Sequence, residues 1–136
     1  MKHNAGVFVT DTHPIAYYAD RRFSRLSKKA RAIFDDAEEG VVVVCVPTIV
    51  LSELTILLQL ERLRIPLPFD KWCRELDGAP GFSIEPLLWT DINEMRQLPF
   101  KDPFDRMIAG AAKRLHLPLI TKDAEITDSG LVETVW

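Results

Sequence analysis

The segment Val41-Val42-Val43-Val44-Cys45-Val46 is a continuous apolar run, and Pro47 ends it. All but one of its residues are valines, whose β-branched side chains favour extended strands. A run without polar alternation is typical of a parallel sheet, because helices cover both faces of such a sheet. We therefore predict a buried parallel strand here.

Two predicted helices flank this run. The first is capped by Ser27 and ends at Gly40, and its apolar residues recur at helical spacing as Ala30, Ile33, Phe34 and Ala37. The second covers residues 48–63 and is apolar nearly all round, although it contains Glu53. A helix this apolar is either buried or forms a dimer face.

The rest of the chain continues the alternation of strands and helices. Further strands are predicted over 7–10, 82–87, 117–121 and 131–136, and further helices over 70–76, 90–98 and 102–116. Because right-handed crossovers join parallel strands, this order predicts an α/β fold, a three-layer α/β/α sandwich with a mostly parallel central sheet. The length of 136 residues suits one domain spanning 1–136.

The composition excludes several classes of protein. Apolar residues make up 47% and charged residues 27%, which is close to the globular average. The formal net charge is -3, so contact with nucleic acid would be local rather than driven by an overall basic field. The apolar runs are too short to span a membrane. The run that follows residues 1–4 is also too short for a secretory signal, so we expect a cytoplasmic protein. Cys45 and Cys73 lack C-x-x-C spacing and are expected to be buried and reduced.

Four acidic residues are predicted to meet at one edge of the sheet. Asp11 ends the first strand and Asp123 lies just past the strand around residue 120, and the carboxyl ends of parallel strands share an edge. Glu53 lies in the second turn of the helix that follows the valine-rich strand. Asp105 lies in the first turn of a helix that should begin near the same edge. Each acid also has a local alternative, as a turn residue, a helix cap or part of a capping box.

Convergence of four carboxylates requires compensation. Two carboxylates ~4 Å apart repel by about 4 kcal/mol at an effective dielectric near 20, and a whole domain is stable by only about 5–15 kcal/mol. Protons or a divalent cation must offset such a charge. Oxygen ligands without His or Cys favour Mg²⁺ or Mn²⁺, and these ions activate water for attack on a phosphodiester. Thr12 and Thr121 flank two of the acids. One interpretation is that their hydroxyls hydrogen-bond the acids or a metal-bound water, and the other is that they cap the local backbone.

Four segments, 9–13, 47–54, 102–109 and 119–123, together resemble a PIN domain. They read Val9-Thr10-Asp11-Thr12-His13, Pro47-Thr48-Ile49-Val50-Leu51-Ser52-Glu53-Leu54, Asp102-Pro103-Phe104-Asp105-Arg106-Met107-Ile108-Ala109 and Leu119-Ile120-Thr121-Lys122-Asp123. More narrowly, they are similar to the VapC toxins of type II toxin–antitoxin modules, over almost the whole chain.

That resemblance implies a Mg²⁺- or Mn²⁺-dependent endoribonuclease on a parallel α/β/α sheet. It also implies a homodimer and a small cognate VapB-like antitoxin that inhibits it. The catalytic and metal-binding acids implied are Asp11, Glu53, Asp105 and Asp123. Asp102 is then either the cap of its helix or a carboxylate that assists a second metal through water.

Basic residues gather outside the acidic motifs, between residues 20 and 31. They are Arg21, Arg22, Arg25, Lys28, Lys29 and Arg31. The group is either a phosphate-gripping patch or a solvated helix face whose charges pair locally, and its order along the helix opposes the dipole, which favours RNA contact. His13 is expected in a loop, near a phosphate or in a structural role, and Arg106 either pairs with Asp105 or contacts RNA. The three tryptophans are expected to pack in the core or an interface, as Trp72, Trp89 and Trp136.

The leading hypothesis from the sequence is a metal-dependent endoribonuclease, the toxin of a toxin–antitoxin pair, that acts on structured RNA such as a transfer RNA loop. The alternative is a non-catalytic RNA- or protein-binding module with the same fold, and the complete acid set counts against it. A phosphate-accepting α/β domain is disfavoured, because no second acid lies two residues after Asp11. Residues 65–99 carry no motif and are where substrate choice is expected to be set.

Overall fold

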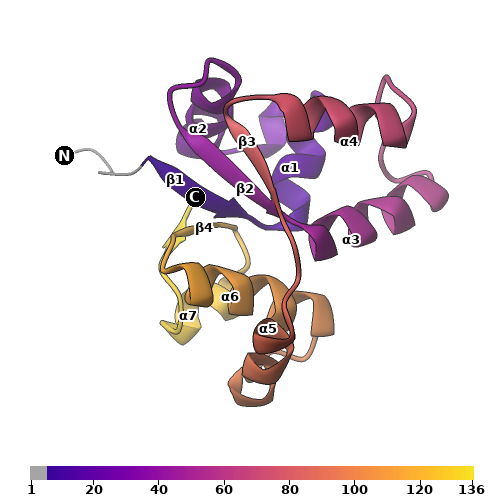
Figure 1. Ribbon diagram of the computed structural model, residues 1–136. Helices are drawn as coiled ribbons and strands as arrows, with labels where there is room; N and C mark the ends of the chain where they lie inside the picture. The colour runs from indigo at the N-terminus through magenta and orange to yellow at the C-terminus, as the bar shows by residue number, and fades with distance from the viewer. Residues whose placement is uncertain (1–5) are drawn as a thin grey trace.

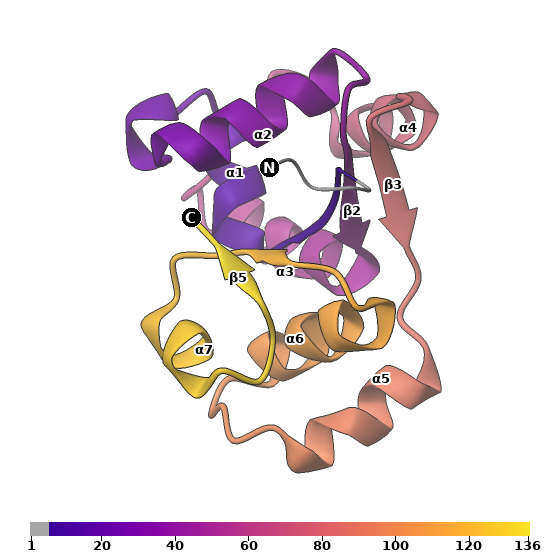
Figure 2. The ribbon, with the colours of Figure 1, turned by 90° about the vertical axis from the view of Figure 1, so that its left-hand side faces the viewer.

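The computed structural model describes residues 6–136 and contains a five-stranded sheet whose neighbouring strands are all parallel. The strands are β1 (Val7–Thr10), β2 (Val43–Pro47), β3 (Phe82–Glu85), β4 (Leu119–Ile120) and β5 (Thr134–Val135). Their spatial order is β3-β2-β1-β4-β5 (Figures 1 and 2). The predicted α/β class and parallel sheet are confirmed. The expected absence of a secretory signal concerns the start of the chain, and residues 1–5 lie outside the described residues.

The central strand, β1, is buried from both faces of the sheet. Val9 pairs with Cys45 of β2 on one side and with Leu119 of β4 on the other. Phe8 and Val9 are almost completely buried, as are the facing residues of β2 and β4. Apolar side chains on both faces explain why these strands read as continuous apolar runs.

Helices cover both faces of the sheet. On one side lie α1 (Thr12–Ala19), α2 (Lys28–Glu38) and α4 (Phe69–Gly78), and on the other α5 (Trp89–Glu94), α6 (Pro103–Leu115) and α7 (Ala124–Ser129) (Figure 1). The long helix α3 (Thr48–Gln59) starts at the carboxyl end of β2 and packs against both α1 and α6. Two 3₁₀ turns complete the described elements, η1 (Phe23–Arg25) and η2 (Met95–Gln97). The predicted three-layer arrangement is confirmed.

The helix predicted after Ser27 is α2. The Ser27 hydroxyl accepts a hydrogen bond from the Ala30 backbone N–H at 3.0 Å. The four apolar residues predicted for its inner face are all buried. At its far end α2 touches the turn before β3 so closely that a Cβ on Gly81 would stand 1.7 Å from the Ala37 carbonyl oxygen. Only glycine fits at that position.

Several predicted boundaries are wrong by two to four residues. β2 begins at Val43, because Gly40 turns the chain with φ at 74° and leaves Val41 70% exposed. The helix α3 stops at Gln59 rather than near residue 63, because Glu61 adopts a left-handed conformation with φ at 58°. β3, β4 and β5 are also shorter than predicted, and the predicted helix over 90–98 is divided into α5 and η2.

Two helices were not predicted. The helix α1 contains Pro14 in its first turn, where a missing N–H costs nothing, so proline did not exclude a helix there. His13 is consequently helical and not in a loop. The helix α7 has six residues, which is too short to display a helical period.

Three further expectations concern single residues and membrane association. Cys45 is buried, but Cys73 is only half-buried, and both are free thiols. Trp89 is 76% exposed and therefore lies outside the core. None of the helices within residues 6–136 is long and apolar enough to cross a membrane.

Candidate active site

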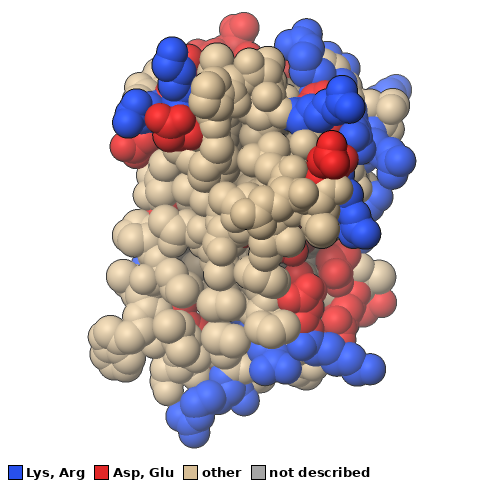
Figure 3. All heavy atoms as spheres, turned by 90° about the vertical axis from the view of Figure 1, so that its right-hand side faces the viewer, with Lys and Arg blue, Asp and Glu red and all other residues tan. Residues whose placement is uncertain are grey.

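A cavity of about 260 Å³ lies at the carboxyl ends of β1 and β4. The acidic residues in its wall come from distant parts of the sequence and are Asp11, Glu53, Asp102, Asp105 and Asp123. All four acids predicted to converge therefore do so, together with the predicted supporting residues Asp102 and Thr121. On the face shown in Figure 3, a group of Asp and Glu side chains lies at the lower right, with Lys and Arg side chains above and below it.

Asp11 is the most buried of these acids, at 7% exposure. It follows β1 directly and caps α1, and its Oδ1 accepts a hydrogen bond from the Thr12 backbone N–H at 2.8 Å. Its Oδ2 accepts a hydrogen bond from the Thr121 hydroxyl at 2.7 Å. Both carboxylate oxygens are thus held by residues next to strand ends, so the end of β4 orients the acid at the end of β1.

Glu53 reaches the cavity from α3. Its Oε1 accepts a hydrogen bond from the Thr12 hydroxyl at 2.5 Å. Thr12 is 1% exposed, and it therefore holds Glu53 through its side chain while it holds Asp11 through its backbone. Of the two uses predicted for this threonine, the contact with an acid is the one present.

The remaining acids lie at helix starts. Asp102 caps α6 by accepting a hydrogen bond from the Phe104 backbone N–H at 2.8 Å, and Asp105 lies in the first turn of the same helix. Asp123 caps α7, with Oδ1 accepting from the Ile126 N–H at 3.0 Å. Helix N-termini favour negative charge, so the local sequence stabilises carboxylates at the places where they meet.

The carboxyl groups of the cavity affect one another's ionisation. Burial first, and then the negative charges of Asp11, Asp102, Asp123 and Glu53, raise the pKa of Asp105 to about 7. Burial also raises the pKa of Asp11 and of Glu53 above their ordinary values. The shifts arise mainly from burial and, at Asp105, also from neighbouring negative charge, which protons or a cation would neutralise.

The donor set fits a hard divalent cation. Carboxylate oxygens dominate the wall, which are the ligands that Mg²⁺ and Mn²⁺ prefer. Among residues 6–136, no three His, Cys, Asp or Glu side chains form a ready-made metal cluster. Asp102 and Asp123 each use one oxygen for a helix cap.

Three residues of the cavity wall, Pro14 among them, were not assigned to the site from the sequence, and Arg106, which was assigned, lies elsewhere. His13 and Lys122 line the cavity, and each is close in sequence to one of the acids, which is the signal that identifies them. Arg106 is not in the cavity wall. Its guanidinium donates to the backbone carbonyls of Phe100 and Lys101, so it is held by the loop before α6.

The basic residues between 20 and 31 lie around the end of α1 and the start of α2. The guanidinium groups of Arg21 and Arg31 lie over the Phe23 ring, at 5.5 and 4.0 Å from its centroid. Arg22 forms an ion pair with Asp20 at 2.8 Å. Lys28 and Lys29 begin α2 and are exposed, and none of the group lines the acidic cavity.

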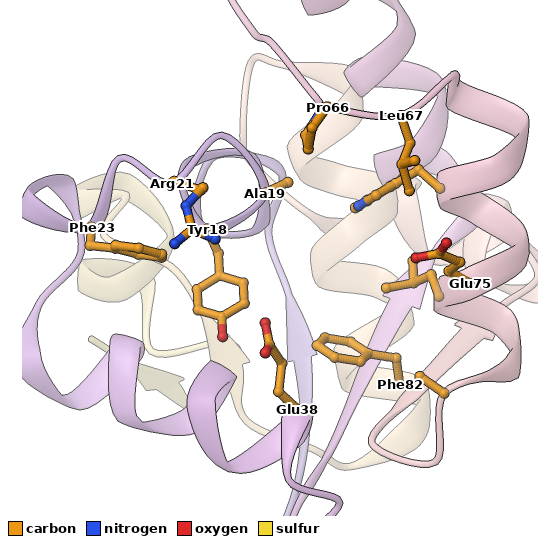
Figure 4. Close-up of a pocket in the computed structure, with 12 residues that line it drawn as sticks. Tyr18, Ala19, Arg21, Phe23, Glu38, Pro66, Leu67, Glu75 and Phe82 are labelled. Carbon is orange, nitrogen blue, oxygen red and sulfur yellow. The ribbon is translucent and has the colours of Figure 1, made fainter.

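A larger cavity, of about 380 Å³, lies away from the acids. Figure 4 shows Tyr18, Phe23 and Phe82 in its wall, with Arg21 on one side and Glu38 near its centre. The Tyr18 hydroxyl donates to Asp35 Oδ1 at 3.0 Å. This mostly aromatic and aliphatic wall holds no group of carboxylates, so the smaller acidic cavity is the better candidate for chemistry.

Solved structures of other proteins share this fold. No curated protein matches the chain. The toxin–antitoxin complex VapBC2 from Rickettsia felis, crystallised with a DNA fragment from its promoter, contains a similar chain with a TM-score of 0.67 at 12% identity, covering 95% of this chain and 97% of that one. FitAcB from Neisseria gonorrhoeae has a TM-score of 0.64 at 19% identity, and the match covers 95% of this chain and 96% of that one. DNA-bound VapBC from Salmonella typhimurium has a TM-score of 0.62 at 17% identity, and the match covers 94% of this chain and 96% of that one.

These structural neighbours are VapC and FitB toxins of toxin–antitoxin complexes, and at such low identity they establish a shared fold. A family model described as "PIN domain" matches residues 8–129, which is most of the chain and includes every acid of the cavity. The chain therefore belongs to the PIN domain family.

Proposed function

We propose that this chain is a metal-dependent endoribonuclease and the toxin of a toxin–antitoxin pair, acting as one nuclease domain over residues 1–136. The observation that carries the proposal is the convergence of five carboxylates in one cavity at the carboxyl ends of β1 and β4. That is where an open parallel sheet binds its ligands. Carboxylates that repel one another lower the stability of the fold. A function at this site explains why they are retained, whereas packing does not.

In this proposal Asp11, Glu53, Asp105 and Asp123 hold Mg²⁺ or Mn²⁺. When bound, such an ion polarises a phosphodiester and lowers the pKa of a water molecule, so no covalent protein nucleophile is required. The chain's own residues orient the ligands. The Thr121 hydroxyl fixes Asp11, and the Thr12 hydroxyl fixes Glu53, so both carboxylates are in position before any ligand arrives.

Two partners belong to the proposal. The structural neighbours come from toxin–antitoxin complexes, which supports a small antitoxin of the VapB type as inhibitor. A homodimer is supported by exposed apolar side chains on α3, directly after it and on α5, which are Ile56, Leu60, Trp89 and Ile92. Figure 3 shows a broad uncharged area beside the acidic group. Sedimentation velocity of the purified chain, with a two-fold mass as the expected result, tests the dimer.

The nuclease is tested by incubating a total small-RNA pool with purified protein in Mg²⁺, Mn²⁺ or EDTA, beside an Asp11→Asn variant. We expect cleavage only with metal and only by the wild-type chain. The cleaved species would identify the substrate, for which structured RNA such as a transfer RNA loop is our proposal. If the wild-type chain cleaves no more RNA than the variant under any of these conditions, the nuclease proposal is wrong.

A further inference from the structure

A third and smaller cavity adjoins the acidic one, and in this section we call it the second cavity. It has a volume of about 170 Å³, and His13 lies in the walls of both cavities. Its wall is built from α1, the segment that runs from residue 20 through η1, the last part of α3 and the turn after α3. The two hollows therefore meet at the first turn of α1, where the chain leaves β1 at Asp11.

The second cavity has the opposite charge. Three arginines line it, Arg22, Arg25 and Arg62, against the single carboxylate of Asp20. Asp20 is engaged by the Arg22 Nε at 2.8 Å and also accepts from the Arg64 backbone N–H at 3.3 Å. Within residues 6–136, Arg25 and Arg62 form no ion pair with a carboxylate, and both residues are exposed. Two guanidinium groups are thus available to an anion from solvent.

An aromatic ring lies between the two charged regions. Tyr17 lines the second cavity, and its ring centroid is 5.9 Å from the His13 ring. The Arg25 guanidinium lies 5.9 Å from that centroid, and the Lys122 ammonium lies 5.6 Å from it. Lys122 also lines the acidic cavity, so cations and an aromatic face lead from one hollow to the other. Proteins that bind single-stranded nucleic acid commonly combine cationic side chains with aromatic faces.

We propose that the second cavity, which we call the arginine subsite (Arg22, Arg25 and Arg62), binds a backbone phosphate of the RNA next to the one that enters the acidic cavity. This inference rests on the proposed nuclease function. The acidic cavity repels a polyanion, so the strand needs cations beside it to stay in register. Contacts of this type position a nucleic acid without reading its sequence. Of the residues grouped as basic from the sequence, only Arg22 and Arg25 take part, and Arg62 joins them from a distant segment.

The test uses a charge-matched pair of double variants. Arg25→Gln with Arg62→Gln removes two positive charges from the arginine subsite. Lys71→Gln with Arg74→Gln removes two from exposed positions on α4, which line neither cavity. Affinity for a fluorescent mixed-sequence single-stranded RNA is measured in EDTA, which prevents cleavage, over a range of salt concentrations. Cleavage kinetics in Mg²⁺ are measured on the same proteins.

If the arginine subsite binds phosphate, the first double variant loses about tenfold in affinity at moderate salt. The slope of log affinity against log salt should become shallower by about 0.7, the contribution of one phosphate contact on a single strand. The α4 variant should keep both the wild-type affinity and the wild-type slope. In Mg²⁺ the first variant should show a raised KM with little change in kcat.

Equal behaviour of the two double variants would overturn the inference, because the effect would then be one of net charge alone. Metal-dependent cleavage with unchanged KM in the first variant would overturn it as well, while leaving the nuclease function intact. A wild-type chain that neither binds nor cleaves RNA would overturn both proposals. Methylphosphonate substitution of single linkages adds a positional check: one linkage beside the cleavage site should matter to the wild-type chain and not to the first variant.

Discussion

Replacing Asp105 by Asn should stabilise the metal-free protein above neutral pH. The negative charge at this position is unfavourable in the folded chain, since burial and four neighbouring carboxylates raise the pKa of Asp105 from 3.8 to about 7. A shift of this size corresponds to about 4 kcal/mol at about 1.4 kcal/mol per unit. Because the side chain is only half-buried, solvent screening reduces this to about 2 kcal/mol.

The pH dependence gives the prediction its sign. Near pH 4 the unfolded chain releases the Asp105 proton, whereas the folded chain keeps it up to about pH 7. Between these values the folded state binds more protons, so the free energy of unfolding of the wild-type chain falls as the pH rises. Asn carries no such penalty. The advantage of Asp105→Asn should therefore be absent below pH 4, grow between pH 4 and 7, and stay constant above.

The assay is urea unfolding in EDTA at pH 5, 6, 7 and 8, supported by thermal melts. We expect a gain of about 2 kcal/mol at pH 8, or about 7 °C in melting temperature for a chain of this length. Glu133→Gln serves as control, because it removes one carboxylate from an exposed position outside the acidic cavity. Mg²⁺ should narrow the gap between Asp105→Asn and the wild-type chain. An equal effect at pH 5 and pH 8, or no gain beyond that of the control, would refute the electrostatic reasoning.

Three further substitutions probe the site and its scaffold. Thr121→Val removes the hydrogen bond to Asp11 and should lower kcat about 10- to 100-fold in the RNA cleavage assay while the circular dichroism spectrum is kept; unchanged kcat would show that this hydroxyl does not orient the acid. Arg114→Leu leaves the buried carboxylate of Asp91, now paired at 2.6 Å, without its cation and should cost about 3 kcal/mol in urea unfolding; a loss below about 1 kcal/mol would contradict this. Gly81→Ala places a Cβ against the backbone of α2 and should cost about 3 kcal/mol or more, so a wild-type melting temperature would disprove the close approach.

The acids were accessible to sequence reasoning because topology alone places them. A parallel sheet brings the carboxyl ends of its strands to one edge, so Asp11 and Asp123 are predicted to be neighbours without any knowledge of side-chain packing. Glu53 and Asp105 follow from the direction in which a crossover helix must run. The residues that orient the acids do not follow from topology, because a threonine beside an aspartate caps the backbone as readily as it binds a carboxylate.

Other features depended on contacts that no local pattern announces. Pro14 concealed α1, although proline is acceptable in a first turn. Arg62 lies far in sequence from Arg25, and only the turn formed at Glu61 brings it to the arginine subsite. Arg106 lies beside an acid in sequence, yet its side chain is turned toward the carbonyls of the preceding loop. Such placements follow from tertiary packing and not from spacing.

We propose above that the carboxylates at the carboxyl ends of β1 and β4 form a divalent-cation site. Its most direct test is titration of the purified protein with Mn²⁺ at pH 7.5, with free Mn²⁺ followed by electron paramagnetic resonance. We expect at least one Mn²⁺ bound per chain, displaced by Mg²⁺. Mn²⁺ binding should be weaker in both Asp11→Asn and Asp105→Asn but not in Glu133→Gln. Absence of Mn²⁺ binding, or binding that these two substitutions leave unchanged, would contradict it.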